Sequence, residues 1–316
     1  MKRAIPLLNL KEFISGEQNQ KNAFVSELTW ALKNIGFVGI VEHGIPDQLV
    51  ADFYSSAKQF FSLPESVKRK YVVEGLAGQR GYTAFGKEHA KHSNIADLKE
   101  FFQIGQTVVG DDDIRSDYPD NLETLDVPLF SKAGDLLYKE FEASGAHLLR
   151  AIALGLDLDE QFFDANILNG NSILRAIHYP PIIQEPDSAI RAEQHEDINL
   201  ITLLVGASAG GLQILSKEGD WLDISPQENE IVVNVGDMLQ RLTNNMLKST
   251  THRVVNPTRE FWHVPRLSIP FFLHPRRSMN LRCLDSCINR DNPIHYEAIT
   301  AGEYLNERLC EIGLKK

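Results

Sequence analysis

The stretch AEQHEDINLITLL, residues 192–204, begins with polar residues and ends in an apolar run rich in branched side chains. This change predicts a strand that enters a buried sheet. Because alternate side chains of a strand share a face, we expect His195 and Asp197 on one face and Glu196 on the other. An imidazole nitrogen and a carboxylate oxygen side by side could take two adjacent positions on a divalent metal ion.

A third metal ligand has to come from another part of the chain. His252, in the segment KSTTHRVV at 248–255, is the best candidate. Two histidines and one carboxylate form the facial triad that leaves positions open on non-haem Fe(II). Each histidine alone is more often an ordinary strand residue than a ligand. Asp197 is harder to explain in this way, because a buried carboxylate is costly unless it is paired or bound to a metal.

The segment RLS at 266–268 opens a later apolar run and again separates two polar residues by one position. Arg266 offers a planar fork suited to a carboxylate, and Ser268 adds a hydroxyl on the same face. Taken alone, Arg266 would more often form a structural ion pair. Its position after the three proposed ligands favours a carboxylate-binding role instead.

The ordered set His195-x-Asp197, His252, Arg266-x-Ser268 resembles the isopenicillin N synthase-like family of Fe(II)/2-oxoglutarate-dependent oxygenases. The resemblance implies a mainly β fold with flanking helices, in which a double-stranded β-helix (jelly roll) core follows a helical N-terminal region. It implies that His195, Asp197 and His252 are the catalytic metal ligands, and that Arg266 and Ser268 bind 2-oxoglutarate. The expected reaction uses O2 to oxidise, most often to hydroxylate, a small-molecule substrate, with release of succinate and CO2.

The segment RAIHYP at 175–180 resembles the family's Tyr-Tyr-Pro stretch, with His178 in place of the first tyrosine. The resemblance implies that Tyr179 also binds 2-oxoglutarate, through its far carboxylate. Arg175 could face the cosubstrate or the substrate, and a structural salt bridge explains it equally well.

Two phenylalanines are candidates for the substrate pocket. Phe272 matches an aromatic residue that lines the pocket in relatives, although a plain core phenylalanine is the simpler explanation. Phe85 lies in the segment 78–89, whose mixture of glycine, aromatic and cationic residues is typical of loops that shape binding sites. Several cationic residues favour an anionic or amino-acid-like substrate, although solvated surface charges explain most of them equally well: Arg80, Lys87, His89, Lys99 and Arg175.

Two other functions remain open at this stage. A same-family Fe(II) oxidase that does not use 2-oxoglutarate could also carry the Arg-x-Ser pair, with the arginine holding a substrate carboxylate. A non-catalytic metal- or carboxylate-binding protein is a less favoured alternative, and a zinc hydrolase is weaker still because no positioned general base is evident.

The composition excludes several partners. The 316 residues carry a net charge of -11, and no basic tract is present, which argues against nucleic acid and anionic membranes. No run is long enough to span a bilayer, and the first apolar run is too short for a signal peptide. The three cysteines (Cys283, Cys287 and Cys310) do not form an even-numbered disulfide framework, which favours the cytoplasm.

The chain is expected to be organised in four consecutive parts within one compact unit. These are an N-terminal α/β region at 1–120, backing helices at 121–170, the β-helix core at 171–280 and a C-terminal helical segment at 281–316. Apolar spacing predicts one long helix at 129–156. The short strands that follow, with few helices between them, are typical of an antiparallel sandwich or jelly roll.

Overall fold

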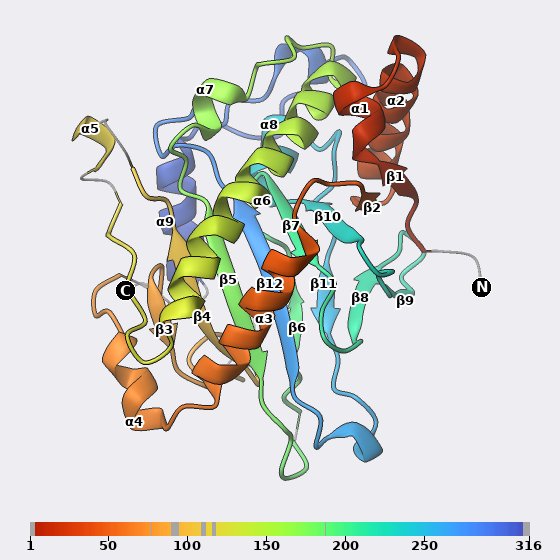
Figure 1. The fold of residues 1–316 in the computed structure, drawn as a ribbon. Helices are drawn as coiled ribbons and strands as arrows, with labels where there is room; N and C mark the ends of the chain where they lie inside the picture. The colour runs from red at the N-terminus through yellow and green to blue at the C-terminus, as the bar shows by residue number, and fades with distance from the viewer. Residues whose placement is uncertain are drawn as a thin grey trace.

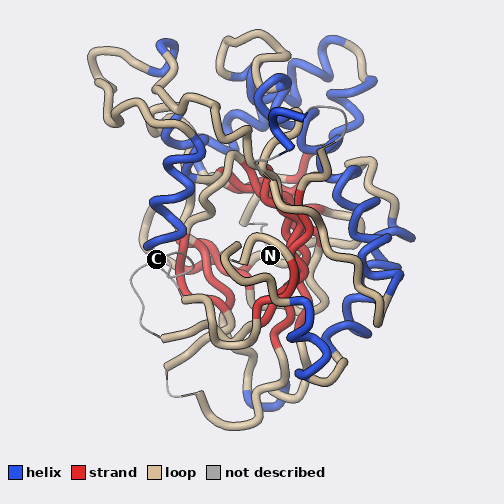
Figure 2. The backbone as a smooth tube through the Cα atoms, turned by 90° about the vertical axis from the view of Figure 1, so that its left-hand side faces the viewer, coloured by secondary structure: helices blue, strands red, loops and turns tan. Residues whose placement is uncertain are grey.

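Two β-sheets lie against each other in the computed structural model, and Figure 2 shows them as two layers of strands. The structure describes residues 4–76, 78–89, 95–108, 112–115, 118–186 and 188–311. Neighbouring strands are antiparallel except for the first two, which are parallel. Among the described residues, the mainly β fold with flanking helices is confirmed.

The larger sheet has eight strands and the smaller sheet has four. In spatial order the larger sheet contains β1 (Leu7–Asn9), β2 (Phe37–Val41), β10 (Ile231–Val235), β7 (Ile201–Val205), β12 (Arg266–Leu273), β5 (Ile173–Tyr179), β4 (Glu100–Gly105) and β3 (Gly81–Thr83). The smaller sheet contains β6 (Ala192–His195), β11 (His252–Val254), β8 (Leu212–Leu215) and β9 (Trp221–Asp223).

The helices lie mainly on the outer face of the larger sheet and at its ends (Figure 1). They are α1 (Leu10–Ser15), α2 (Gln18–Asn34), α3 (Asp47–Phe61), α4 (Glu65–Lys68), α5 (Asp112–Arg115), α6 (Pro128–Gly155), α7 (Asp164–Ile167), α8 (Asp237–Leu242) and α9 (Ala301–Glu311). Short 3-10 turns are found at Arg69–Tyr71, Arg259–Phe261 and Asp285–Cys287. The long helix predicted at 129–156 is confirmed by α6.

Helix α6 can cross the larger sheet closely because small residues face it. A Cβ atom at Gly145 would stand 2.3 Å from the Leu273 Cδ1 atom, and one at Gly134 would stand 2.1 Å from Ile104 Cδ1. On the same helix, Phe141 stacks on Phe271 of β12 with 5.3 Å between ring centroids. This contact anchors the strand that carries Arg266 and Ser268, so the packing of the outer face supports the inner face.

Strands from the N-terminal region and from the later part of the chain share the larger sheet. β2 pairs with β10, and β4 pairs with β5. The expected division of the chain into four consecutive parts stays a prediction, because strands from different parts pair within one sheet. Over the described residues, no helix is both long and apolar enough to cross a membrane. Cys283, Cys287 and Cys310 are free thiols.

Glu142 of α6 gives the fold a pH-dependent element. Its Oε1 atom has no hydrogen-bond partner among the described residues, and burial raises the pKa of the carboxyl to about 7. The unfolded chain would titrate near the ordinary value of about 4.3. The folded protein therefore holds the proton more tightly, so this contribution to stability is complete below the unfolded pKa and is lost as the pH rises through about 7.

We expect Glu142→Gln to match the wild type in free energy of unfolding near pH ~4.5 and to exceed it by about 1–2 kcal/mol at pH ~8.5, after discounting for partial exposure. The cause is that glutamine removes the charge that folding would otherwise have to bury. Urea unfolding of both proteins at the two pH values measures the difference. A difference that does not change with pH would contradict this account.

Candidate active site

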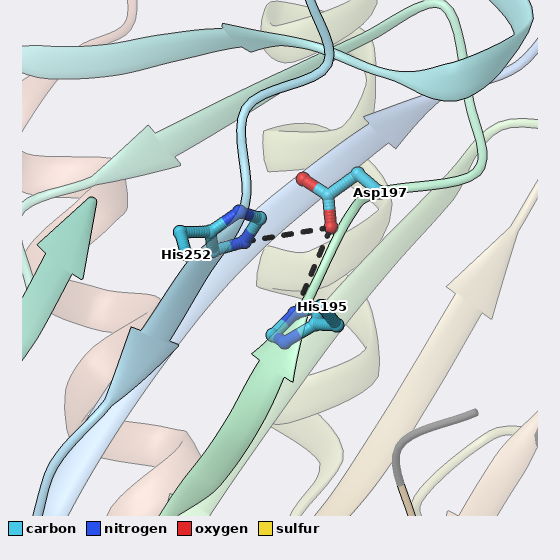
Figure 3. A group of neighbouring side chains, drawn as sticks. All are labelled: His195, Asp197 and His252. Carbon is cyan, nitrogen blue, oxygen red and sulfur yellow. Dashed lines mark ion pairs between the residues drawn. The ribbon is translucent and has the colours of Figure 1, made fainter. Parts of the chain in front are cut away.

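Three side chains that could bind a metal converge between the two sheets. His195 is the last residue of β6 and His252 is the first of β11, and the two are paired in the smaller sheet. Asp197 lies in the segment that leads from β6 to β7. Its Oδ1 atom is 4.0 Å from His195 Nε2 and 3.8 Å from His252 Nε2. The dashed lines in Figure 3 mark these two contacts. Possible ligand atoms of all three lie within 4.8 Å of one another, so one ion could contact them together.

The continuous strand predicted over 192–204 is wrong. β6 ends at His195, and β7 begins at Ile201 in the other sheet. The link between them is held by the Asp197 carbonyl, which accepts a hydrogen bond of 2.7 Å from the Asp237 amide. Asp197 therefore reaches the histidines from a loop between two sheets, because the chain changes sheets there, and strand alternation does not explain the pairing.

Glu196 is not part of this group, although it lines the cavity beside it. Its side chain is exposed and accepts a hydrogen bond from the Thr251 hydroxyl. The carboxylate is thus engaged at the surface. Of the two adjacent acids, Asp197 is the one that faces the histidines.

Each histidine has one ring nitrogen engaged and the other directed at the group. His195 Nδ1 is 2.6 Å from the Glu193 carbonyl oxygen, and His252 Nδ1 is 3.2 Å from the Thr250 carbonyl oxygen. A carbonyl oxygen can only accept, so each Nδ1 carries the proton and each Nε2 keeps a free lone pair. This is the tautomer that a metal ligand needs.

Asp197 is oriented in the same manner by two neighbours on the larger sheet. Its Oδ2 atom accepts hydrogen bonds from the Thr202 hydroxyl at 2.6 Å and from the Asn234 side-chain amide at 2.8 Å. Oδ1 is left facing the histidines. Sequence reasoning missed Thr202 and Asn234, yet a polar residue inside each of two strongly apolar strands was a signal that could have found them.

The electrostatics suit a cation. Burial alone would raise the pKa of Asp197, but His252, His195 and the two hydrogen bonds outweigh burial and lower it. Burial and the neighbouring His252 lower the pKa of His195. Both shifts favour the forms that metal binding requires, an ionised carboxylate and a neutral imidazole.

A cavity of about 610 Å³ opens next to the three side chains. Its lining includes the whole set expected from the sequence except one residue: His195, Asp197, His252, Arg266, Ser268, Tyr179, Arg175 and Phe272. The exception is Phe85, which is 49% exposed and does not line the cavity. The placement of Phe85 in the substrate pocket therefore stays a prediction without support from the described lining of the cavity.

Arg266 is a buried cation without an acidic partner. Its side chain is only 2% exposed, Nε donates to the Ala209 carbonyl at 3.0 Å, and Nη1 has no hydrogen-bond partner in the part of the chain that the structure describes. Within the described residues, no carboxylate lies within 4.0 Å of it. The register places it opposite Tyr179, whose ring centroid is 5.0 Å from the guanidinium carbon. A buried guanidinium in this state is stabilised by an anion that enters the cavity, so the residues fit a carboxylate ligand.

A second buried guanidinium, not anticipated from the sequence, lies near Arg266. Arg191 is 2% exposed, its Nη2 donates to the Val264 carbonyl at 3.0 Å, and its guanidinium carbon is 6.0 Å from the Tyr179 ring centroid. Burial and the neighbouring Arg266 lower the pKa of Arg191 to about 10. Two cations close together strengthen the positive potential at this end of the cavity.

Arg175 behaves differently, because it has a partner. Its Nη1 is 3.2 Å from both carboxylate oxygens of Glu88, and its Nε donates to Gln103 Oε1 at 3.2 Å. The guanidinium carbon also lies 4.2 Å from the Phe101 ring centroid and 5.2 Å from that of Phe272. The salt bridge considered for Arg175 is therefore present, and the residue lines the cavity as well.

Comparisons with known proteins agree with this geometry. Residues 170–275 match the 2OG-Fe(II) oxygenase superfamily, and residues 5–123 match the N-terminal region of the non-haem dioxygenases of morphine synthesis. The chain is 32% identical to proline hydroxylase buaE of Petromyces alliaceus over 96% of this chain and 98% of the relative. It is 29% identical to the 2-oxoglutarate-dependent dioxygenase htyE of Aspergillus rugulosus, over 95% and 97%.

Two solved structures are similar over nearly the whole chain. A 2OG-Fe(II) oxygenase family protein from Caulobacter crescentus shares 39% identity with a TM-score of 0.88, covering 98% of this chain and 100% of that one. A Neurospora crassa protein, solved in complex with α-ketoglutarate and thymine, shares 30% identity with a TM-score of 0.86, covering 97% and 96%. The expected jelly-roll core is thereby confirmed. Fe(II) as the metal cofactor, and 2-oxoglutarate and O2 as the cosubstrates, are confirmed as well. The chain belongs to the 2OG-Fe(II) oxygenase superfamily and is an Fe(II)- and 2-oxoglutarate-dependent dioxygenase.

Proposed function

We propose that His195, Asp197 and His252 hold the Fe(II) ion, and that the enzyme hydroxylates a small molecule. The support is the convergence of the two free Nε2 atoms and Asp197 Oδ1 beside a cavity. Three protein ligands leave positions for the cosubstrate and O2. Because Asp197 supplies a carboxylate, no protein-ligand position is left for a halide, which disfavours halogenation.

Arg266, Ser268 and Tyr179 would hold the far carboxylate of 2-oxoglutarate. The observation that carries this proposal is the unpartnered Arg266 Nη1 in the same cavity as the three ligands. A guanidinium matches a carboxylate with two parallel hydrogen bonds, and the serine and tyrosine hydroxyls add donors beside it. Arg191 contributes positive potential, while its own hydrogen bond to Val264 keeps it in place.

Bound Fe(II) and 2-oxoglutarate together supply an oxidant from O2, with release of CO2 and succinate. The chain's own residues have other tasks. Thr202 and Asn234 keep Asp197 Oδ2 engaged, so that Oδ1 stays directed at the metal position. The carbonyls of Glu193 and Thr250 fix the two imidazole tautomers. The enclosing sheets limit the water that reaches the reacting atoms.

Hydroxylation is tested by coupling succinate formation to substrate. The enzyme is incubated with Fe(II), 2-oxoglutarate and a panel of small molecules, and succinate and product are measured together. We expect one compound to stimulate succinate release in a one-to-one ratio with a product that has gained one oxygen atom. Product formation without succinate would instead identify an oxidase that does not use 2-oxoglutarate, and no O2 consumption with any compound would favour a binding protein.

Two substrate classes are supported by different observations. A similar enzyme is named a proline hydroxylase, which favours an anionic or amino-acid-like molecule, although Lys99 and Arg175 in the cavity are each paired with a carboxylate. The similar Neurospora crassa protein was solved with thymine, an uncharged ring, and shares comparable identity with this chain. We also propose a cytoplasmic location, because three free thiols suit a reducing compartment.

A further inference from the structure

The register of the larger sheet divides the cavity into two ends. On β12 the side chains of Arg266, Ser268 and Phe272 line the cavity, so they lie along one face, and His274, which directly follows the strand, lines it as well. Arg266 stands opposite Tyr179 at one end. Phe272 lies further along the strand, and His274, just after the end of β12, marks the other end.

The metal position lies between these ends. Phe272 is paired with Thr202 on β7, and Thr202 is paired with Asn234 on β10. These are the two residues that hold the Asp197 carboxylate. Phe272 therefore lies level with these residues, Arg266 is displaced from this row in one direction along β12, and His274 follows the strand in the other direction. If Arg266 marks the 2-oxoglutarate end, the opposite end is available to the substrate.

The two cationic side chains that contact Glu88 in the cavity are already neutralised. Arg175 lies on β5 between the rows of Ser268 and Phe272, and Lys99 directly precedes β4 and lies toward the Tyr179 end. Glu88 lies 3.2 Å from Arg175 Nη1 and 2.7 Å from Lys99 Nζ, and Asp97 lies 2.7 Å from the same ammonium group. Burial alone would raise the pKa of Glu88, but Arg175 and Lys99 outweigh it and lower the pKa to about 2. The carboxylates of Glu88 and Asp97 therefore balance the charges of Lys99 and Arg175.

Only one of the lysines and arginines that line the described cavity lacks such a balance. Lys99, Arg175 and Arg308 each form a salt bridge, the last of them with Glu311. Arg266 has none among the described residues. A substrate carboxylate at the second end would thus meet no uncompensated cation, and a buried, unpaired carboxylate is costly.

His274 offers a neutral polar group at this end. It is 7% exposed, lines the cavity, and its Nδ1 has no hydrogen-bond partner among the residues that the structure describes. Burial lowers the pKa of His274 to about 4, so the ring is uncharged near neutral pH. Leu305 and Leu309 of α9 line the same cavity and add apolar surface.

We infer that Arg175, Phe272 and His274 form the substrate subsite, and that this subsite selects an uncharged, hydrogen-bonding molecule with a flat apolar face over an anion or a zwitterion. Arg175 would donate hydrogen bonds while its charge stays balanced by Glu88, Phe272 would pack against the ring, and His274 would be a specificity-determining residue. The inference rests on the proposed function only in taking Arg266 as the 2-oxoglutarate end.

Benzamide and benzoate test this charge preference, because they share one ring and differ in a neutral amide and a carboxylate. Each is titrated calorimetrically into the full chain loaded with Fe(II) and saturating 2-oxoglutarate without O2, so that Arg266 is occupied. We expect benzamide to bind roughly tenfold or more tightly than benzoate, because the anion would be buried unpaired. Tighter binding of benzoate would overturn the inference.

Glu88→Gln tests the cause of the preference and decides the matter even if neither probe binds the wild type measurably. It leaves Lys99 and Arg175 with one carboxylate between them, so benzoate affinity should rise by roughly tenfold. Glu88→Asp keeps the charge and is the matched control, which should retain the wild-type preference. No gain for benzoate in Glu88→Gln would overturn the inference. If Glu88→Gln does not fold, Asp97→Asn makes the same charge change.

His274→Phe tests the polar role of the imidazole. We expect this variant to lower the affinity for benzamide at least about fivefold, because one buried hydrogen bond is lost. The affinity for 2-oxoglutarate should stay unchanged. His274→Gln, which can still hydrogen-bond, should restore part of the affinity. Unchanged benzamide affinity in His274→Phe would remove His274 from the subsite. These titrations need no turnover, so their failure is distinguishable from failure of succinate release.

Discussion

Asp197→Ala is expected to lose Fe(II) binding and to lower substrate-dependent succinate formation by at least about a thousandfold, or about 4 kcal/mol of transition-state stabilisation. The variant removes the one carboxylate that faces both Nε2 atoms, and two neutral imidazoles cannot balance a divalent cation as well. Anaerobic Fe(II) titration followed by a succinate assay measures both effects.

Glu196→Ala is the matched control, since it removes the adjacent acid, which bonds Thr251 at the surface. It should bind Fe(II) as the wild type does. Thr202→Val keeps the shape and removes the hydroxyl that holds Asp197 Oδ2, so an intermediate loss of about 10–100-fold in metal affinity is expected. Loss of iron in Glu196→Ala with retention in Asp197→Ala would contradict the ligand assignment.

Arg266→Ala is expected to raise the apparent KM for 2-oxoglutarate by at least about a hundredfold, because a charge-assisted, bidentate contact worth about 3 kcal/mol is lost. Arg266→Lys should recover part of this loss, since lysine keeps the charge but lacks the planar fork. Initial rates of succinate formation over a range of 2-oxoglutarate concentrations give KM and kcat separately.

Pyruvate supplies the internal control for Arg266. It has the same 2-oxo acid end as 2-oxoglutarate and no far carboxylate, so its weak use should be equal in the wild type and in Arg266→Ala. An equal loss with both oxo acids would mean that Arg266 acts on the fold or on the metal. A change in the KM for the substrate, with no change in the KM for 2-oxoglutarate, would mean that Arg266 binds the substrate.

The local chemistry of the site could be predicted from the sequence, because short patterns carry it. The alternation in β12 places Arg266 and Ser268 on one face as expected. The polar pair His195 and Asp197 identified the metal group, although the two residues do not lie on one continuous strand as expected. A sequence pattern does not reveal where a chain leaves one sheet for another, since that depends on strands paired from distant segments.

Pairings between distant residues explain the remaining differences. Arg175 could be a ligand-binding cation or an ion-pair member until its distance to Glu88 was known. His274 carried no local pattern, and its proposed role rests on a buried Nδ1 atom that has no hydrogen-bond partner among the described residues. Phe85 had the right residue type, but its side chain is half exposed and is not among the described residues that line the cavity. Burial and partner choice are thus the quantities that the sequence alone did not supply.

The most direct test of the metal site is a crystal structure of the protein with Fe(II) and 2-oxoglutarate, prepared without O2, with data collected at the iron edge. The account predicts a single anomalous peak about 2.0–2.2 Å from His195 Nε2, Asp197 Oδ1 and His252 Nε2, with the far carboxylate of 2-oxoglutarate on Arg266. Iron bound elsewhere, or held without Asp197, would contradict it.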